Sequence, residues 1–145
     1  MARIVRPMKK DPADPQRPLV APRFCCLGVR LREVTLIPPG DPAGQVQADG
    51  MGMSVSADWK NLDPQLIPEE LEDDENGARG KKMAVFVLGN GTGPFAEAPV
   101  AHGLEMHFKP NKTDSGNVCP VVATMLVQFQ ADLAATAPNW EIDPS

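Results

Sequence analysis

Alternating hydrophobic and polar positions predict several short strands. In "LEMHF", Leu104, Met106 and Phe108 alternate with Glu105 and His107, a period of two that places the apolar side chains on one face of a sheet. Further extended segments are predicted in "RFCCLGVRLREVTLI", "GMGMSVSADW", "MAVFVLGNG" and "NVCPVVA". Stretches rich in proline and glycine, such as "PPGDPAGQ", are typical of the turns between them. Pro120 favours an edge or bulge position for the last segment.

One segment, "TMLVQFQADLAATA", has the spacing of an amphipathic helix. Its predicted apolar face consists of Leu126, Phe129, Leu133 and Ala137. Thr124 is expected to cap the start of the helix, and Pro138 is expected to end it. The predicted fold class is therefore α+β, with a small twisted, mainly antiparallel sheet and one C-terminal amphipathic helix packed on it.

The region between the second and third predicted strands is rich in proline and acidic residues. Its prolines allow one short helical turn from Pro68 to Leu71. The carboxylates of "EELEDDEN" must stay solvated, because adjacent residues cannot bury that much charge. Residues 72–82 are therefore predicted to form an exposed loop.

Charge is unevenly distributed along the chain. The 145 residues carry a net charge of −5, but residues 1–23 hold six basic and two acidic residues, so the remainder is strongly acidic. This first segment is also proline-rich, and we predict a basic extended arm over 1–23 and a single α+β domain over 24–143. The arm is expected to lie on an acidic surface, its own or a protein partner's. Nucleic acid is not expected, because no aromatic side chain for stacking precedes Phe24 and the acidic body would repel phosphate.

The hydrophobic pattern and the cysteines bear on the cell compartment. No apolar stretch approaches the roughly 20 residues of a membrane span, and no basic-then-apolar leader is present, so we expect no membrane association. The odd set of Cys25, Cys26 and Cys119 lacks a C-x-x-C spacing, which favours reduced thiols in a cytoplasm. Together with His102 and His107 these cysteines match no metal-ligand spacing, so no metal site is predicted.

The strand in "GMGMSVSADW" raises the question of a ligand, because Ser54 and Ser56 share one face of it. An enzyme that cleaves the nicotinamide–ribose bond needs a cation for the pyrophosphate, hydroxyls that brace the ribose, and a carboxylate that stabilises an oxocarbenium-like centre. The candidate catalytic residues are Ser54, Ser56 and Glu105, with Glu97 as an alternative carboxylate, and the candidate cofactor-binding residues are Arg30, Arg32 and His102. Such residues also occur on the solvent faces of ordinary sheets. The stretch could therefore equally be a turn that leads into a buried edge of the sheet and binds no ligand.

Five segments between residues 27 and 143 carry a resemblance to known proteins: "LGVR", "DGMGMSVSADWKNLDPQLIPEEL", "GNGTGPFAEAPVAHGLEMHFKP", "SGNVCPVVATM" and "FQADLAATAPNWEID". Their order resembles a group of small uncharacterised bacterial proteins with the pattern G-G-M-S-V, H-G-x-x-x-P and A-L-x-x-T-x-x-x-W. That group is remotely similar to type VI secretion toxins with an ADP-ribosyltransferase-like fold. In this chain Met51-Gly52 replaces the paired glycines, and Ser115 replaces the histidine.

The resemblance implies an ADP-ribosyltransferase-like sheet and a small toxin, or a degenerate relative of one, that acts on NAD. The alternative hypothesis is a non-catalytic interaction subunit of a larger complex, which docks through its basic N-terminal arm. NAD turnover by the purified protein would separate the two.

Overall fold

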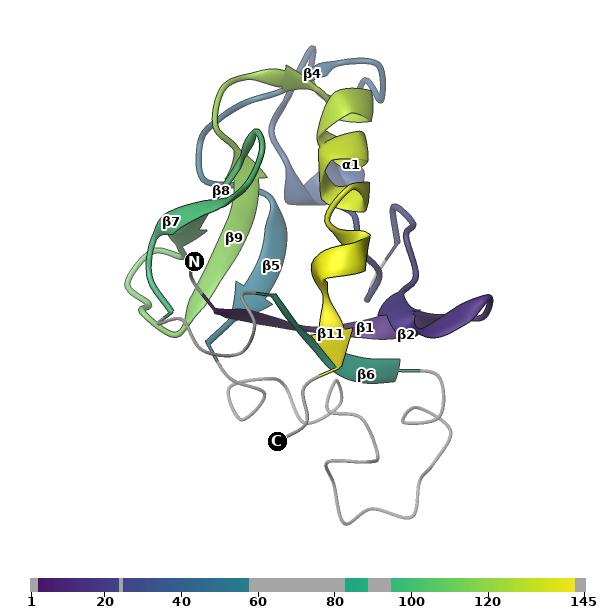
Figure 1. Cartoon of the computed structure of the whole chain (residues 1–145). Helices are drawn as coiled ribbons and strands as arrows, with labels where there is room; N and C mark the ends of the chain where they lie inside the picture. Colours follow the sequence, from purple (N-terminus) through teal and green to yellow (C-terminus); the bar gives the residue numbers. More distant parts are fainter. Residues whose placement is uncertain (1–2, 24, 58–82, 89–94, 143–145) are drawn as a thin grey trace.

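Most strands belong to one sheet in the computed structural model, which describes residues 3–23, 25–57, 83–88 and 95–142. The strands of this sheet are β1 (Ile4–Asp11), β2 (Asp14–Pro18), β5 (Met53–Ser56), β6 (Met83–Leu88), β7 (Ala98–Ala101), β8 (Leu104–Phe108), β9 (Ser115–Pro120) and β11 (Glu141–Ile142). Their order is β11-β6-β1-β5-β9-β8-β7, with β2 paired to β1 (Figure 1). The strand pairs of this sheet are antiparallel throughout the described residues, which confirms the predicted mainly antiparallel sheet.

A smaller sheet and one α-helix complete the described fold. The small sheet has the order β10-β4-β3 and consists of β10 (Thr124–Met125), β4 (Gln45–Val46) and β3 (Leu36–Ile37). The helix α1 (Leu126–Ala134) follows β10 directly, and two short 3₁₀ helices are present, η1 (Leu31–Glu33) and η5 (Ala137–Asn139). The predicted α+β class with a single C-terminal helix is therefore confirmed for the described residues.

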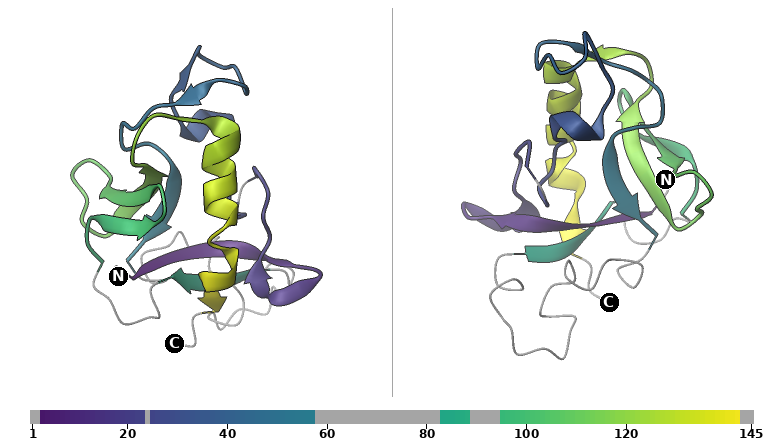
Figure 2. Two further views of the ribbon diagram at one scale, coloured as in Figure 1. Left: turned by 45° about the horizontal axis from the view of Figure 1, so that its top comes forward. Right: turned by 180° about the vertical axis from the view of Figure 1, so that it is seen from behind.

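The large sheet is curled because its two halves are joined at a narrow place. β1 and β5 share the single register pair Val5–Ser56, whereas β1 and β6 pair continuously from Ile4–Leu88 to Lys9–Met83. Figures 1 and 2 show that β1 and β6 run across the direction of β5 and β9, with α1 standing on the concave side. The resulting half-barrel holds the main core on one side of the sheet, and a smaller buried cluster of Val5, Val85 and Val87 is separate from it.

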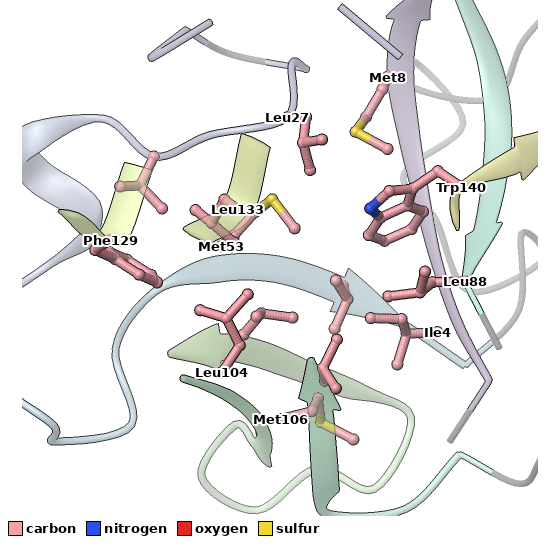
Figure 3. Close-up of a cluster of buried hydrophobic side chains, with 14 of the residues drawn as sticks. Ile4, Met8, Leu27, Met53, Leu88, Leu104, Met106, Phe129, Leu133 and Trp140 are labelled. Carbon is pink, nitrogen blue, oxygen red and sulfur yellow. The ribbon is translucent and has the colours of Figure 1, made fainter. Parts of the chain in front are cut away.

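The core fills the concave side of the sheet. The three predicted apolar residues within α1, Leu126, Phe129 and Leu133, are all buried, as their helical spacing requires. Figure 3 shows Phe129 and Leu133 of the helix facing side chains from the strands. The indole of Trp140 is buried as well, and its Nε1 donates a hydrogen bond of 2.9 Å to the Thr136 hydroxyl. The tryptophan therefore enters the core with its polar atom satisfied.

Several predicted element ends are corrected by the structure. Thr124 belongs to β10, and its hydroxyl donates to the Val122 carbonyl, so Met125 precedes the helix without a side-chain cap. Ala137 lies in η5, beyond the end of α1. Pro120 ends β9, which is an interior strand between β5 and β8. The predicted turn at 68–71, the predicted loop at 72–82 and residues 89–94 lie outside the described residues.

The segment 23–37, predicted as one strand, is not a continuous strand. Its backbone takes positive φ angles at Cys25 (57°) and Gly28 (155°), which break an extended run. Glycine is required at residue 28, because a Cβ there would lie 2.5 Å from the Ala21 carbonyl oxygen. The side-chain amide of Gln130 bonds both the N–H and the C=O of Val29. A side chain of the helix thus satisfies the backbone groups of Val29, which a neighbouring strand would otherwise bond.

The predicted extended arm over 1–23 is corrected over most of its length, because Ile4–Asp11 and Asp14–Pro18 are strands of the large sheet. β1 lies between β6 and β5, and β2 folds back on β1. Ile4, Val5 and Met8 are 0 % exposed. Burial of these side chains stabilises the sheet by roughly 1.5–3 kcal/mol each. This gain outweighs the free-energy cost of ordering a segment rich in charge and proline. The domain therefore begins with β1 and not after residue 23.

Candidate functional site

A row of polar side chains crosses the face of the large sheet that is turned away from the core. Ser54 of β5 lies opposite Asn117 of β9, and Asn117 lies opposite His107 of β8. Residues directly opposite each other in antiparallel strands share one face. The adjacent positions Met53, Val118 and Met106 are buried in the core. The alternation predicted for these strands is therefore present, and it collects polar groups on one side.

A pocket of about 540 Å³ lies at the Ser54 end of this row. It is lined by Arg32 and Glu33 of η1, Met51 and Gly52 before β5, Ser54 of β5, Lys109 and Pro110 after β8, and Asn117 of β9. Gly52 permits the close approach of β5 to β9, because a Cβ at this position would overlap the Val118 carbonyl. The lining combines two cationic side chains, one carboxylate, a hydroxyl and an amide, a set suited to an anionic, hydroxylated ligand.

Lys109 contacts the side chain of Ser54. Its Nζ atom donates a hydrogen bond of 2.8 Å to the Ser54 hydroxyl oxygen. Burial lowers the pKa of Lys109 below 10.5, and the nearby charges of Lys112 and Arg6 lower it further, while Glu33 opposes them. An anion bound in the pocket would stabilise the charged form of Lys109, because it would offset the repulsion from the neighbouring positive charges.

Arg6 of β1 holds the backbone next to the pocket in place. Its Nη1 donates a hydrogen bond of 2.6 Å to the Ser54 carbonyl, and its Nε and Nη2 donate to the Cys26 carbonyl. The side chain is buried, and this burial lowers the pKa of Arg6 from its usual value, although Glu33 acts in the opposite direction. Arg6 therefore joins β1, β5 and the Cys26 turn, and it adds positive charge behind the pocket.

Glu33 is the carboxylate of the pocket. Its Oε1 accepts a hydrogen bond of 2.8 Å from the Arg30 backbone N–H and one of 3.1 Å from the Arg30 guanidinium. The Glu33 side chain is 17 % exposed and that of Arg30 is 29 % exposed. The pair orients the carboxylate at the start of η1. Arg30 thus acts on the pocket through Glu33, and it does not line the pocket.

A second polar cluster surrounds His107. The Nε2 atom of His107 lies 2.7 Å from Oε1 of Glu105, and Nδ1 lies 3.3 Å from Oε2 of Glu97. The hydrogen bond with Glu105 raises the pKa of His107 above 6.5, burial opposes this, and Glu97 adds to the increase. The carboxylate of Glu97 also accepts a hydrogen bond of 3.0 Å from the Phe108 N–H. The imidazole is therefore held in place from both sides.

Cys119 adjoins this cluster from β9. It lies directly opposite Glu105, and its sulfur is 3.6 Å from the Glu105 carbonyl oxygen. Burial and the Glu105 charge raise the pKa of Cys119 to about 11. The free thiol is therefore protonated near neutral pH and is not an activated nucleophile.

The structure brings together only part of the site predicted from sequence. Ser54 and Arg32 line the same pocket, as expected, but Ser56 is 8 % exposed and is not part of the lining. Glu105 and Glu97 bond to His107, away from that lining. His102 is exposed in the turn between β7 and β8. The three predicted catalytic residues are therefore divided between the pocket, the interior and the His107 cluster.

Sequence reasoning missed Lys109, Arg6, Asn117 and Glu33. Lys109 continues the alternation of Glu105 and His107 by one more step, so the same period of two could have identified it. Arg6 shares the period of two with the buried Ile4 and Met8, so alternation alone assigns it to the core face and gives no signal for a place beside the pocket. Glu33 and Asn117 carry no local signal, because their places in the pocket depend on contacts between distant segments.

No protein-family model, curated protein or solved structure matches this chain. Among the described residues, no helix has both the length and the apolar character needed to cross a membrane.

Proposed function

We propose that this chain is a small ADP-ribosyltransferase-like protein that binds NAD, either as a toxin that transfers ADP-ribose or as a degenerate relative that acts on NAD less efficiently. The observation that carries the proposal is the Ser54 hydroxyl, held by Lys109 at 2.8 Å in a pocket that Arg32 also lines. The volume of about 540 Å³ lies within the range of ligand pockets, roughly 300–1,000 Å³. Its cations complement the two negative charges of a pyrophosphate.

Each lining residue has a role in this proposal. Arg32 and Lys109 bind the pyrophosphate, and the Ser54 hydroxyl contacts the adjacent ribose. Glu33 takes the role that the sequence assigned to Glu105, because Glu33 lines the pocket while Glu105 is bonded to His107. When the nicotinamide–ribose bond breaks, its electron pair leaves with nicotinamide and positive charge develops on the ribose. The Glu33 carboxylate stabilises that charge until water or an acceptor group attacks.

NAD binding by the tag-free protein tests the proposal. Calorimetric titration with NAD, and separately with ADP-ribose, is expected to give saturable binding that weakens as salt rises. Arg32→Ala is expected to lower the affinity about 10-fold or more, since a charge-assisted hydrogen bond contributes about 1.5–3 kcal/mol. Arg32 is exposed, so this variant should stay folded. The matched control is Arg23→Ala, which removes another exposed arginine that is not part of the pocket lining.

Chromatographic detection of released nicotinamide then separates an active transferase from a degenerate relative. A folded protein that binds neither NAD nor ADP-ribose at millimolar concentration would overturn the proposal. The non-catalytic interaction subunit would then be the remaining hypothesis. Equal affinities in the Arg32→Ala and Arg23→Ala variants would show that NAD binds elsewhere.

A further inference from the structure

Three different metal-binding side chains meet on the polar face of β8 and β9. Glu105 and His107 are two residues apart in β8, and Cys119 lies opposite Glu105 in β9. A spacing of two places Glu105 and His107 on one face of the strand, and the direct cross-strand position places Cys119 on that face as well. Their ligand atoms all lie within 4.8 Å of one another.

We propose that Glu105, His107 and Cys119 bind one zinc ion. Carboxylate oxygen, imidazole nitrogen and thiolate sulfur are donor types that proteins use for Zn²⁺. The Cys119 thiol releases its proton to solvent as the zinc–sulfur bond forms. Metal–ligand bonds of about 2.0–2.3 Å in a tetrahedral site place the ligand atoms about 3.3–3.8 Å apart. The ligand atoms of the cluster, all within 4.8 Å of one another, therefore lie close to the spacing that a bound ion would impose.

Glu97 supports the proposal from outside the ligand set. Its carboxylate faces Nδ1 of His107, which leaves Nε2 directed at Glu105. A ligating histidine commonly donates its other ring N–H to a carboxylate, which fixes the tautomer and the orientation of the ring. Glu97 is itself held by the Phe108 N–H. The imidazole is thus oriented with Nε2 available for the ion.

The exposure of the three groups suits an ion that enters from solvent. Cys119 is 1 % exposed at the base of the cluster, whereas the side chains of His107 and Glu105 are 41 % and 30 % exposed. A water molecule completes the coordination on the open side, as in zinc sites with three protein ligands. The bound ion would tie β8 to β9 and stabilise the native state according to its concentration.

An ordinary ion pair of His107 with two carboxylates is the competing explanation, and the thiol distinguishes it from a metal site. The tag-free, reduced full-length chain is titrated with Zn²⁺ and, as a spectroscopic probe, with Co²⁺. We expect one ion per chain, a thiolate-to-cobalt charge-transfer band, and a melting temperature that rises with Zn²⁺ but not with Mg²⁺. Cys119→Ser should abolish the band, whereas the control Cys25→Ser, which changes another buried thiol, should retain it.

Two variants at partly exposed positions keep the test decisive even if Cys119→Ser folds poorly. His107→Gln is expected to lower the Zn²⁺ affinity at least 100-fold, and Glu97→Gln about 10- to 100-fold. Unchanged affinity in His107→Gln, a cobalt band that survives Cys119→Ser, or no saturable Zn²⁺ binding at about 100 μM would overturn the metal site. These measurements use no NAD, so they succeed or fail independently of the proposed function.

Discussion

Lys109 and Ser54 are 55 positions apart in sequence, yet the Lys109 Nζ donates a hydrogen bond of 2.8 Å to the Ser54 hydroxyl. Because β9 separates β5 from β8 in the sheet, this bond spans a central strand. It joins the residue that follows β8 to the polar face of β5. Both residues line the pocket, and the contact sets the spacing between the ammonium group of Lys109 and the hydroxyl of Ser54.

A double-mutant cycle with Ser54→Ala and Lys109→Met should detect this bond in the folded protein. We expect a coupling of about 0.5–1.5 kcal/mol in the free energy of unfolding, less than for a fully buried charged bond, because both side chains are only partly buried. Urea denaturation of the four proteins measures it. Strictly additive effects would contradict a stabilising Lys109–Ser54 bond.

Phe129→Ala should lower the free energy of unfolding by about 3–5 kcal/mol, because it leaves a cavity beneath α1. Phe129 is 0 % exposed. The matched control is Val127→Ala, two positions away and 76 % exposed, which should change stability by no more than about 0.5 kcal/mol. Chemical denaturation compares the two variants, and a loss below about 1 kcal/mol for Phe129→Ala would place the helix outside the core.

The position of β1 inside the sheet predicts very different changes in stability for substitutions at two adjacent residues. Met8→Asp should destabilise the fold by more than about 4 kcal/mol, because it buries an unpaired carboxylate. Lys9→Gln, at an exposed position, should change stability by no more than about 0.5 kcal/mol. Thermal melts followed by circular dichroism measure both. Full tolerance of Met8→Asp would return this segment to the role of a separate arm.

The vicinal thiols of Cys25 and Cys26 should make stability fall above pH 9. Burial raises the pKa of both thiols from 9.0. Above pH 9 the unfolded chain therefore loses these protons while the native chain keeps them, so stability present below pH 9 declines as pH rises towards the folded pKa values. The decline is at most about 1.4 kcal/mol per pH unit for each thiol.

Urea denaturation between pH 8 and pH 10.5 compares the native sequence with the variant carrying Cys25→Ser and Cys26→Ser. The variant should show a smaller decline, and the difference between the two curves isolates the thiols from lysines that titrate in the same range. Identical slopes would mean that the two thiols ionise equally in the folded and unfolded chains.

Elements governed by local periodicity were predictable from the sequence. The alternation in 104–108 predicted β8, and the three- and four-residue steps of Leu126, Phe129 and Leu133 predicted the buried face of α1. Both patterns work because a strand or a helix fixes which neighbouring residues share a face. The same rule places Ser54 on the face of β5 that is turned away from the buried side chains of Met53 and Val55.

Contacts between distant segments were decided only by the tertiary structure. Composition predicted an arm for residues 1–23, but pairing with β5 and β6 makes β1 an interior strand. Burial of its apolar side chains contributes more favourable free energy than the removal of its charged groups from water costs. Strand order likewise joined Ser54 to Lys109 and Glu105 to Cys119. In β5 and β8 the sequence thus determined the face on which each polar side chain lies. The partners of these side chains depended on which strands became neighbours, a choice set by packing of the whole core.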